Sequence, residues 1–113
     1  MNNLQVMVSQ FNIERNVRVH RDLRVLDLSS EIGEVCKLAF SEGIGKEIDS
    51  AKWQEELGDT LYSLLSLMND LNISAEEALH TVLRKYDKRI SSQNSMSGAP
   101  TLYVKPAAMS SGS

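Results

Sequence analysis

The chain has 113 residues, of which 42% are hydrophobic and 24% charged, and its formal net charge at pH 7 is −3. This length predicts one domain with a modest core, and the composition is typical of a globular protein. The acidic balance argues against a stable nucleic-acid partner, which would require neutralisation of phosphates. No apolar run approaches the roughly 20 residues of a membrane span, and the N-terminus lacks a secretory signal. A cytoplasmic protein without a membrane partner is therefore expected.

Two helices are predicted in the first half of the chain from apolar residues that recur at helical spacing. The first covers about residues 2–15. The second runs from about residue 22 to residue 41, and Gly43 and Gly45 follow its end as stop signals. Five apolar residues form one stripe along the second helix: Val25, Leu28, Ile32, Val35 and Ala39.

Two further helices are predicted in the second half. Asp49 or Ser50 can cap the third helix, which extends to about residue 71. Ser74 and Glu77 form a capping box that begins the fourth helix, which is expected to end near residue 90. The apolar face of the third helix comprises Trp53, Leu57, Leu61, Leu64, Met68 and Leu71.

These elements predict an all-α fold. No proline precedes Pro100, and no apolar alternation is long enough to build a sheet. Residues 91–113 are rich in serine, glycine, alanine and proline, which do not favour independent folding. The predicted organisation is a helical domain over residues 1–90 followed by an irregular C-terminal arm over residues 91–113.

Two acidic pairs lie beside the apolar stripes. Glu31 and Glu34 belong to the second predicted helix, and Glu56 and Asp59 to the third. Residues three apart share a helix face, so each pair directs two carboxylates the same way. Two such helices packed together could surround one or two hard cations with oxygen ligands. The helical periodicity favours Glu56 over Glu55, which projects toward solvent. The alternative is that the acids form solvated helix faces.

Two glycines and one cysteine accompany these pairs. Gly33 and Gly58 lie inside the acidic motifs, and a glycine inside a helix costs about 1 kcal/mol relative to alanine. Close approach of a helix or a ligand would explain this cost. Cys36 is the single cysteine and cannot form an internal disulfide, so a buried, small hydrophobic role is expected for it.

The chain resembles a known family in several segments. These are Leu28–Val35, Trp53–Tyr62, Leu71–Leu79 and Lys85–Arg89. Together they are similar to the all-α nucleoside triphosphate pyrophosphohydrolases of the MazG-like superfamily, whose motif is Glu-x-x-Glu, a variable connection and Glu-x-x-Asp. The resemblance covers most of residues 22–89 and implies a four-helix MazG-like bundle.

The resemblance also implies roles for particular residues. It implies four ligands for Mg²⁺, with Mn²⁺ as the alternative cation: Glu31, Glu34, Glu56 and Asp59. Lys85, Asp87 and Arg89 would bind the substrate, although Asp87 stands where the family frequently has asparagine. Many relatives have a glutamate where this chain has Ser30, so the general base is unassigned.

The implied activity is hydrolysis of a nucleoside triphosphate or deoxynucleoside triphosphate to the monophosphate and pyrophosphate. The family also implies a homodimer or homotetramer and a role in nucleotide-pool sanitation. Broad apolar faces in so small a chain favour oligomerisation on physical grounds as well.

Two other readings come from different classes of protein. One is a non-enzymatic helical dimerisation or regulatory module in which the acids are only solvated. The other is a di-iron carboxylate protein, because Glu77 and His80 form one Glu-x-x-His motif. Such proteins need two of these motifs, and the only other histidine is His20.

Overall fold

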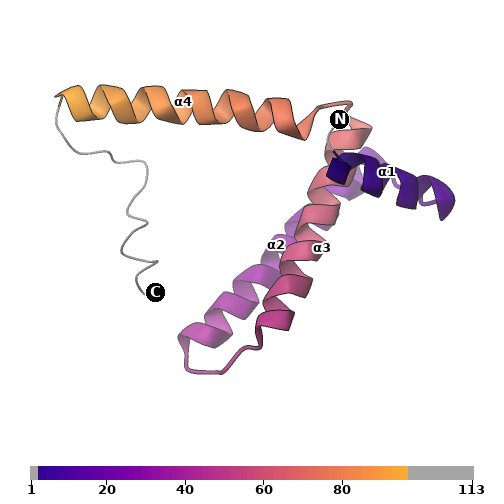
Figure 1. The fold of residues 1–113 in the computed structure, drawn as a ribbon. Coiled ribbons are helices and arrows are strands. Elements are labelled where there is room, and N and C mark those ends of the chain that lie inside the picture. The colour runs from indigo at the N-terminus through magenta and orange to yellow at the C-terminus, as the bar shows by residue number, and fades with distance from the viewer. Residues whose placement is uncertain (1–2, 97–113) are drawn as a thin grey trace. The chain divides into compact units, whose positions relative to one another are not determined.

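The structure is a computed structural model that describes residues 3–96. Its four helices are α1 (Asn3–Glu14), α2 (Arg21–Gly43), α3 (Ser50–Asp70) and α4 (Ala75–Met96) (Figure 1). The described residues contain no strand, so the predicted all-α class with four helices is confirmed.

The end of α4 differs from the prediction. The helix continues to Met96, past the expected end near residue 90. No glycine or proline occurs between residue 90 and Gly98, so the serines there do not terminate the helix. The irregular arm predicted from residue 91 is therefore wrong for residues 91–96, and residues 97–113 lie outside the described part of the chain.

The chain divides into two compact units, residues 1–75 and residues 76–113, and each is described by itself. The first unit contains α1, α2 and α3, and the described part of the second unit is the rest of α4. The boundary predicted at residue 90 stays a prediction.

Side-chain caps fix where α2 and α3 begin. The His20 Nδ1 atom accepts a hydrogen bond from the backbone N–H of Asp22 (3.2 Å), and the Asp49 carboxylate accepts one from Ala51 (3.1 Å). Each cap satisfies an N–H group that has no partner within its helix. Gly45 has a φ of 101°, which turns the backbone between the two helices.

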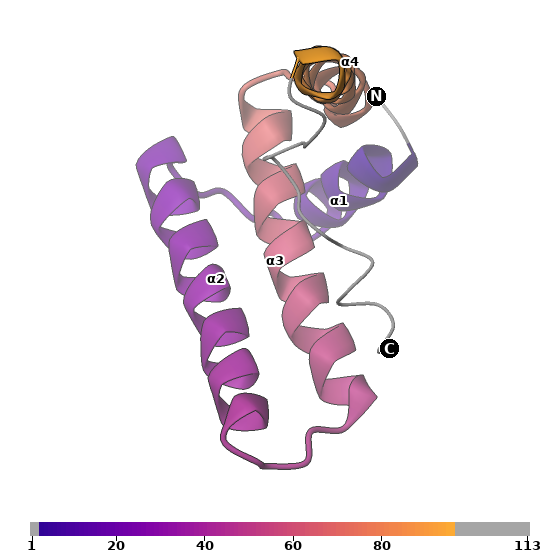
Figure 2. The same cartoon turned by 90° about the vertical axis from the view of Figure 1, so that its left-hand side faces the viewer.

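The first unit is built around a hairpin in which α2 and α3 lie side by side (Figure 2). Among the described residues of this unit, two of the buried ones are hydrophobic, namely Leu38 and Leu65. The other buried residues are polar or charged: Gln5, Arg24, Glu56, Ser63 and Ser66. Hydrogen bonds and ion pairs must therefore hold much of this interior together.

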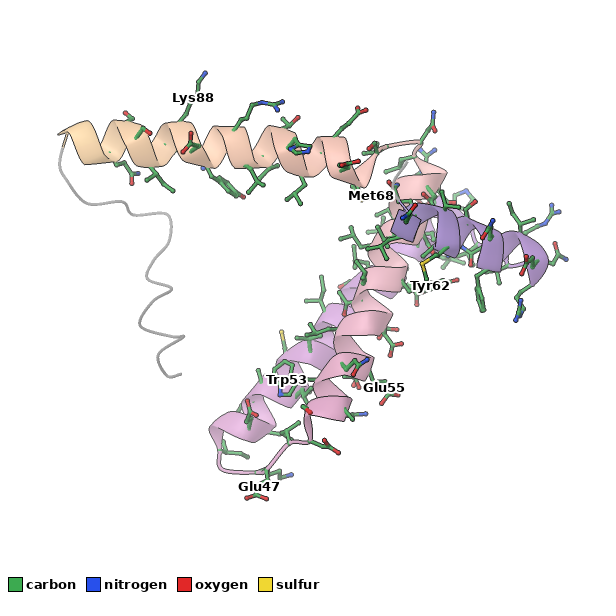
Figure 3. All side chains as sticks on the ribbon, viewed as in Figure 1. Glu47, Trp53, Glu55, Tyr62, Met68 and Lys88 are labelled. Atoms are coloured by element: carbon green, nitrogen blue, oxygen red, sulfur yellow. The ribbon has the colours of Figure 1, made fainter. Side chains whose placement is uncertain are left out.

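Polar contacts attach α1 to α3. The Asn12 side chain donates to the Ser66 hydroxyl (3.2 Å) and accepts from the Tyr62 hydroxyl (2.6 Å), which lies against α1 (Figure 3). At the other end of α1, Gln5 and Asn69 exchange hydrogen bonds of 3.0 Å. The Gln5 side-chain oxygen also accepts the backbone N–H of Ala75 (2.9 Å), the last residue of the first unit.

The apolar stripes of α2 and α3 remain open to solvent in the single chain. Leu57, Leu61 and Leu64 on α3 are 51%, 43% and 39% exposed, while Val25 and Ile32 on α2 are 51% and 48% exposed. Because each residue turns a helix by 100°, the three leucines share one face of α3, and Val25 and Ile32 share one face of α2. We call these five residues the open apolar face.

The expectation for Cys36 is wrong, and the one for Gly33 and Gly58 is narrowed. Cys36 is exposed rather than buried, since it lies four residues after Ile32 on the side of α2 that α3 does not cover. A Cβ atom added to Gly33 or Gly58 would meet no atom within 4 Å. Close approach of another helix of the first unit therefore does not explain these glycines.

Candidate metal centre

Three carboxylates meet between α2 and α3. One oxygen each of Glu31, Glu56 and Asp59 lies within 4.8 Å of the others. Glu31 comes from α2, whereas Glu56 and Asp59 follow one another after one turn of α3. We call these three residues the acidic cluster. The hairpin thus brings together three of the four acids that were predicted to bind metal.

The three members differ in burial. Glu56 is only 8% exposed, Glu31 is half-buried and Asp59 is exposed. Glu55, in contrast, points away from the hairpin (Figure 3), and its side chain is 65% exposed. Helical periodicity favoured Glu56 over Glu55, and Glu56 is the one of the two whose side chain faces α2.

Mutual repulsion gives the cluster its electrostatic character. Partial burial, followed by the nearby carboxylates of Asp59 and Asp27 and then of Glu56 and Glu34, raises the pKa of Glu31 above its ordinary value of 4.5. Desolvation and like charges both disfavour ionisation. A cation placed among these oxygens would relieve the repulsion.

One lysine already neutralises part of the negative charge. The Lys52 ammonium lies 3.1 Å from a Glu56 oxygen and 3.7 Å from a Glu55 oxygen. These partners, with the hydrogen bond to Glu56 first, raise the pKa of Lys52. Lys52 was not among the predicted site residues, although its position four residues before Glu56 was a readable signal.

The chemistry of the acidic cluster fits a hard divalent cation. Mg²⁺ prefers carboxylate oxygens at about 2.0–2.1 Å, so two of its ligands lie at most about 4.2 Å apart. The 4.8 Å span of the cluster exceeds this limit only slightly. Small side-chain adjustments would bring the oxygens to coordination distance, and the exposure of Asp59 leaves the cluster accessible.

Glu34 lies outside the acidic cluster. Its carboxylate is 3.5 Å from the Lys37 ammonium, which is three residues further along α2. The Lys37 side chain is largely exposed, whereas that of Glu34 is 45% exposed. The assignment of Glu34 as a metal ligand stays a prediction.

The residues predicted to bind substrate belong to α4, in the second unit. Lys85 and Arg89 are one turn apart and line a depression of about 480 Å³ together with Arg84 and Lys88. Asp87 does not line it. All four lysine and arginine residues between positions 84 and 89 thus lie near one another on α4. The substrate roles of Lys85, Asp87 and Arg89 stay predictions.

In the described part of the chain, no third acidic, histidine or cysteine side chain lies close enough to Glu77 and His80 to share an ion with them. Among the described residues, the acidic cluster is the one group of three or more acidic, histidine or cysteine side chains close enough to share an ion. Glu77 and His80 do not belong to it.

The fold and the acidic cluster together describe an all-α protein with a candidate metal centre between two helices. A comparison with protein families agrees with this description. The family described as the MazG nucleotide pyrophosphohydrolase domain matches residues 22–92, which is more than half of the chain. The chain therefore belongs to the MazG nucleotide pyrophosphohydrolase domain family, and the resemblance seen in the sequence is confirmed.

One curated relative is an uncharacterized protein, YpjD, from Bacillus subtilis (strain 168). It is 36% identical to this chain over 66 residues, which are 55% of this chain and 60% of YpjD. The match thus spans less than two thirds of the relative's own length. No solved structure matches the chain significantly. Among the described helices, none is long and apolar enough to cross a membrane.

Proposed function

We propose that the protein is a magnesium-dependent nucleoside triphosphate pyrophosphohydrolase that releases a nucleoside monophosphate and pyrophosphate. The observation that carries the proposal is the convergence of Glu31, Glu56 and Asp59 within 4.8 Å in a chain of the MazG family. A triphosphate is strongly anionic and this chain has a net charge of −3, so a cation is needed to join them.

In this proposal the acidic cluster holds Mg²⁺, with Mn²⁺ as an alternative, and Glu34 supplies a further oxygen. Bound there, the cation would neutralise phosphate charge and lower the pKa of a coordinated water. Glu56 contributes a carboxylate that is already oriented, because it is buried against α2 and held by Lys52. Asp59 leaves the cluster open on its exposed side, where a triphosphate can approach.

Residues of α4 complete the proposed substrate site. Lys85 and Arg89 would balance phosphate charge that develops on the leaving pyrophosphate. Asp87 would contact the substrate or its cation through an oxygen. The proposal requires the basic residues of α4 to reach a triphosphate held at an acidic cluster, of the same or of another copy of the chain.

We further propose that the enzyme assembles as a homodimer or homotetramer in the cytoplasm, where its substrates are made. The support for assembly is the open apolar face, whose leucines on α3 are 39–51% exposed. Large exposed apolar patches are uncommon on a monomer and typical of protein contacts.

The test is an assay of a panel of nucleoside and deoxynucleoside triphosphates with and without Mg²⁺, in which both monophosphate and pyrophosphate are measured. The decisive variant is Glu56→Gln, and its matched control is Glu55→Gln. We expect Glu56→Gln to lower kcat/KM at least about 100-fold, a loss typical of a group that stabilises charge in the transition state. Glu55→Gln should retain activity, because its side chain points to solvent.

Equal activity of the two variants would reject the assignment of the acidic cluster. Absence of magnesium-dependent pyrophosphate release from every triphosphate would reject the hydrolase. The remaining reading would then be the helical dimerisation or regulatory module.

A further inference from the structure

A second candidate site lies away from the acidic cluster, at the end of the hairpin that contacts α1. It is a cavity of about 370 Å³ between the end of α1, the turn that follows it, the start of α2 and the end of α3. Arg24 and Asp70 line it, and they precede Glu31 by seven residues and follow Asp59 by eleven. At 1.5 Å per residue, these separations are about 10 Å along α2 and about 16 Å along α3.

The side chain of Arg24 provides the main observation. It is only 5% exposed, and its Nε atom donates to the Asp70 carboxylate at 2.8 Å. Among the described residues, this is the hydrogen bond that the Arg24 side chain makes. No buried side-chain nitrogen is left without a partner in that part of the chain, so the Nη atoms keep some access to solvent, and Arg24 is one of the residues that line the cavity. A largely buried guanidinium at the wall of the cavity thus has N–H donors that are not used by Asp70.

Two further donors surround the same space. The Arg18 Nε atom donates to the Asn16 side-chain oxygen (2.9 Å), which leaves the Arg18 Nη atoms and the Asn16 amide nitrogen to face other groups. Asn16 adopts a φ of 55°, a conformation that asparagine tolerates better than most residues. The turn that carries both side chains is held by a 2.8 Å hydrogen bond from the Val17 N–H to the Asn12 carbonyl.

The charges and the size of the cavity define the class of ligand. Two arginines and one aspartate line it, so the lining has a net positive charge in a chain whose net charge is negative. Ile13 and Val17 add an apolar wall. A guanidinium fork matches the planar oxygens of a carboxylate or phosphate, and the volume suits a metabolite-sized molecule.

We propose that this cavity binds a small organic anion through a carboxylate or phosphate group held by Arg24 and Arg18. The second, partly exposed oxygen of Asp70 would accept a donor of the same ligand. The site is separate from the acidic cluster and needs no metal ion.

The test is a titration of the ¹⁵N-labelled full chain with inorganic phosphate and, separately, with acetate, followed by NMR in the absence of divalent cations. We expect saturable shifts of the Arg24 side-chain Nε–H and of the backbone amides of residues 16–18. Arg18→Gln should weaken binding at least about fivefold, as expected for loss of a charged hydrogen-bond donor. Arg24 is left unchanged because its ion pair with Asp70 is buried.

Arg15→Gln is the matched control, since it removes the same charge from an exposed side chain near the end of α1 that does not line the cavity. It should change the affinity less than Arg18→Gln does. Binding of phosphate alone or of acetate alone would identify which oxyanion the site accepts. Absence of saturable shifts with both anions, or equal weakening by Arg15→Gln, would overturn the proposal. The measurement does not depend on turnover, so it is independent of the outcome of the hydrolase assay.

Discussion

At the scale of single residues, the carboxylates of the acidic cluster repel one another, and one lysine neutralises part of their negative charge. Glu31 faces two carboxylates from α3, and Lys52 neutralises only Glu56 and its neighbour Glu55. A substitution that removes a negative charge from the cluster should therefore relieve the repulsion, and one that removes the lysine charge should increase it. Both effects are measurable.

The raised pKa of Glu31 predicts how stability varies with pH. Below its ordinary pKa of 4.5, Glu31 is protonated in the folded and unfolded states alike. As pH rises through the raised folded-state pKa, ionisation costs more in the folded protein, so the stability that the protonated group contributes is lost. Glu31→Gln should therefore increase the free energy of unfolding at neutral pH by about 0.5 kcal/mol in the absence of metal, the scale of a like-charge pair on a helix.

Urea denaturation in a metal chelator, repeated from acidic to neutral pH, measures this effect. Glu47→Gln is the control, because Glu47 is exposed in the loop between α2 and α3 and does not belong to the cluster. The same pH dependence in Glu31→Gln as in the unmodified protein would contradict the prediction.

Lys52 is predicted to compete with a bound cation for Glu56. Its ammonium lies 3.1 Å from the carboxylate, so Lys52→Gln should free that oxygen and remove a nearby positive charge. We expect the affinity for Mg²⁺ to rise roughly fivefold, the effect of one charge at about 4 Å screened as in water. Isothermal titration calorimetry with Mg²⁺ measures the change.

Lys37→Gln is the matched control, because Lys37 pairs with Glu34 outside the acidic cluster. An equal rise in both variants would mean that overall charge is responsible. An unchanged or weaker affinity in Lys52→Gln would remove Glu56 from the set of ligands.

At the scale of helices, two glycines have opposite conformational requirements. Gly58 lies inside α3, where an added Cβ would meet no atom within 4 Å. Gly45 has a φ of 101°, which alanine rarely adopts. Gly58→Ala should therefore raise the free energy of unfolding by about 1 kcal/mol, and Gly45→Ala should lower it by about that amount or more.

Thermal and urea unfolding of the two variants under identical conditions test this contrast. Destabilisation by Gly58→Ala would show that a ligand or another copy of the chain approaches α3 closely at that position. The close approach that the sequence predicted at this glycine would then occur at a contact with a ligand or another copy rather than within one chain.

At the scale of the whole molecule, the exposed leucines of α3 require a partner surface. Leu61 is 43% exposed at the centre of the open apolar face. Leu61→Asp should shift the protein toward the monomer in sedimentation velocity, because burying an unpaired charge at a contact is costly. Leu26→Asp is the control, since Leu26 is 64% exposed on a different side of α2.

A monomeric unmodified protein, or an equal shift in both variants, would contradict assembly through the open apolar face. If assembly is confirmed, the small interior of the single chain is understandable. The apolar stripes would form a core between copies, and the polar interior would hold the hairpin in register.

The sequence by itself determined the helices, the acidic motifs and the family. Helical periodicity and capping residues are local properties, so α2 and α3 begin and end within a few residues of their predicted limits. The spacing Glu56-x-x-Asp59 likewise depends only on the turn of one helix.

Only the tertiary structure decided which side chains meet. Packing of α2 against α3 brings Glu31 to Glu56 and Asp59 but leaves Glu34 outside the group. The same packing buries Arg24 against Asp70, a contact between residues 46 positions apart in the chain. Such contacts depend on the rotation of one helix relative to another, which periodicity within a single helix does not specify.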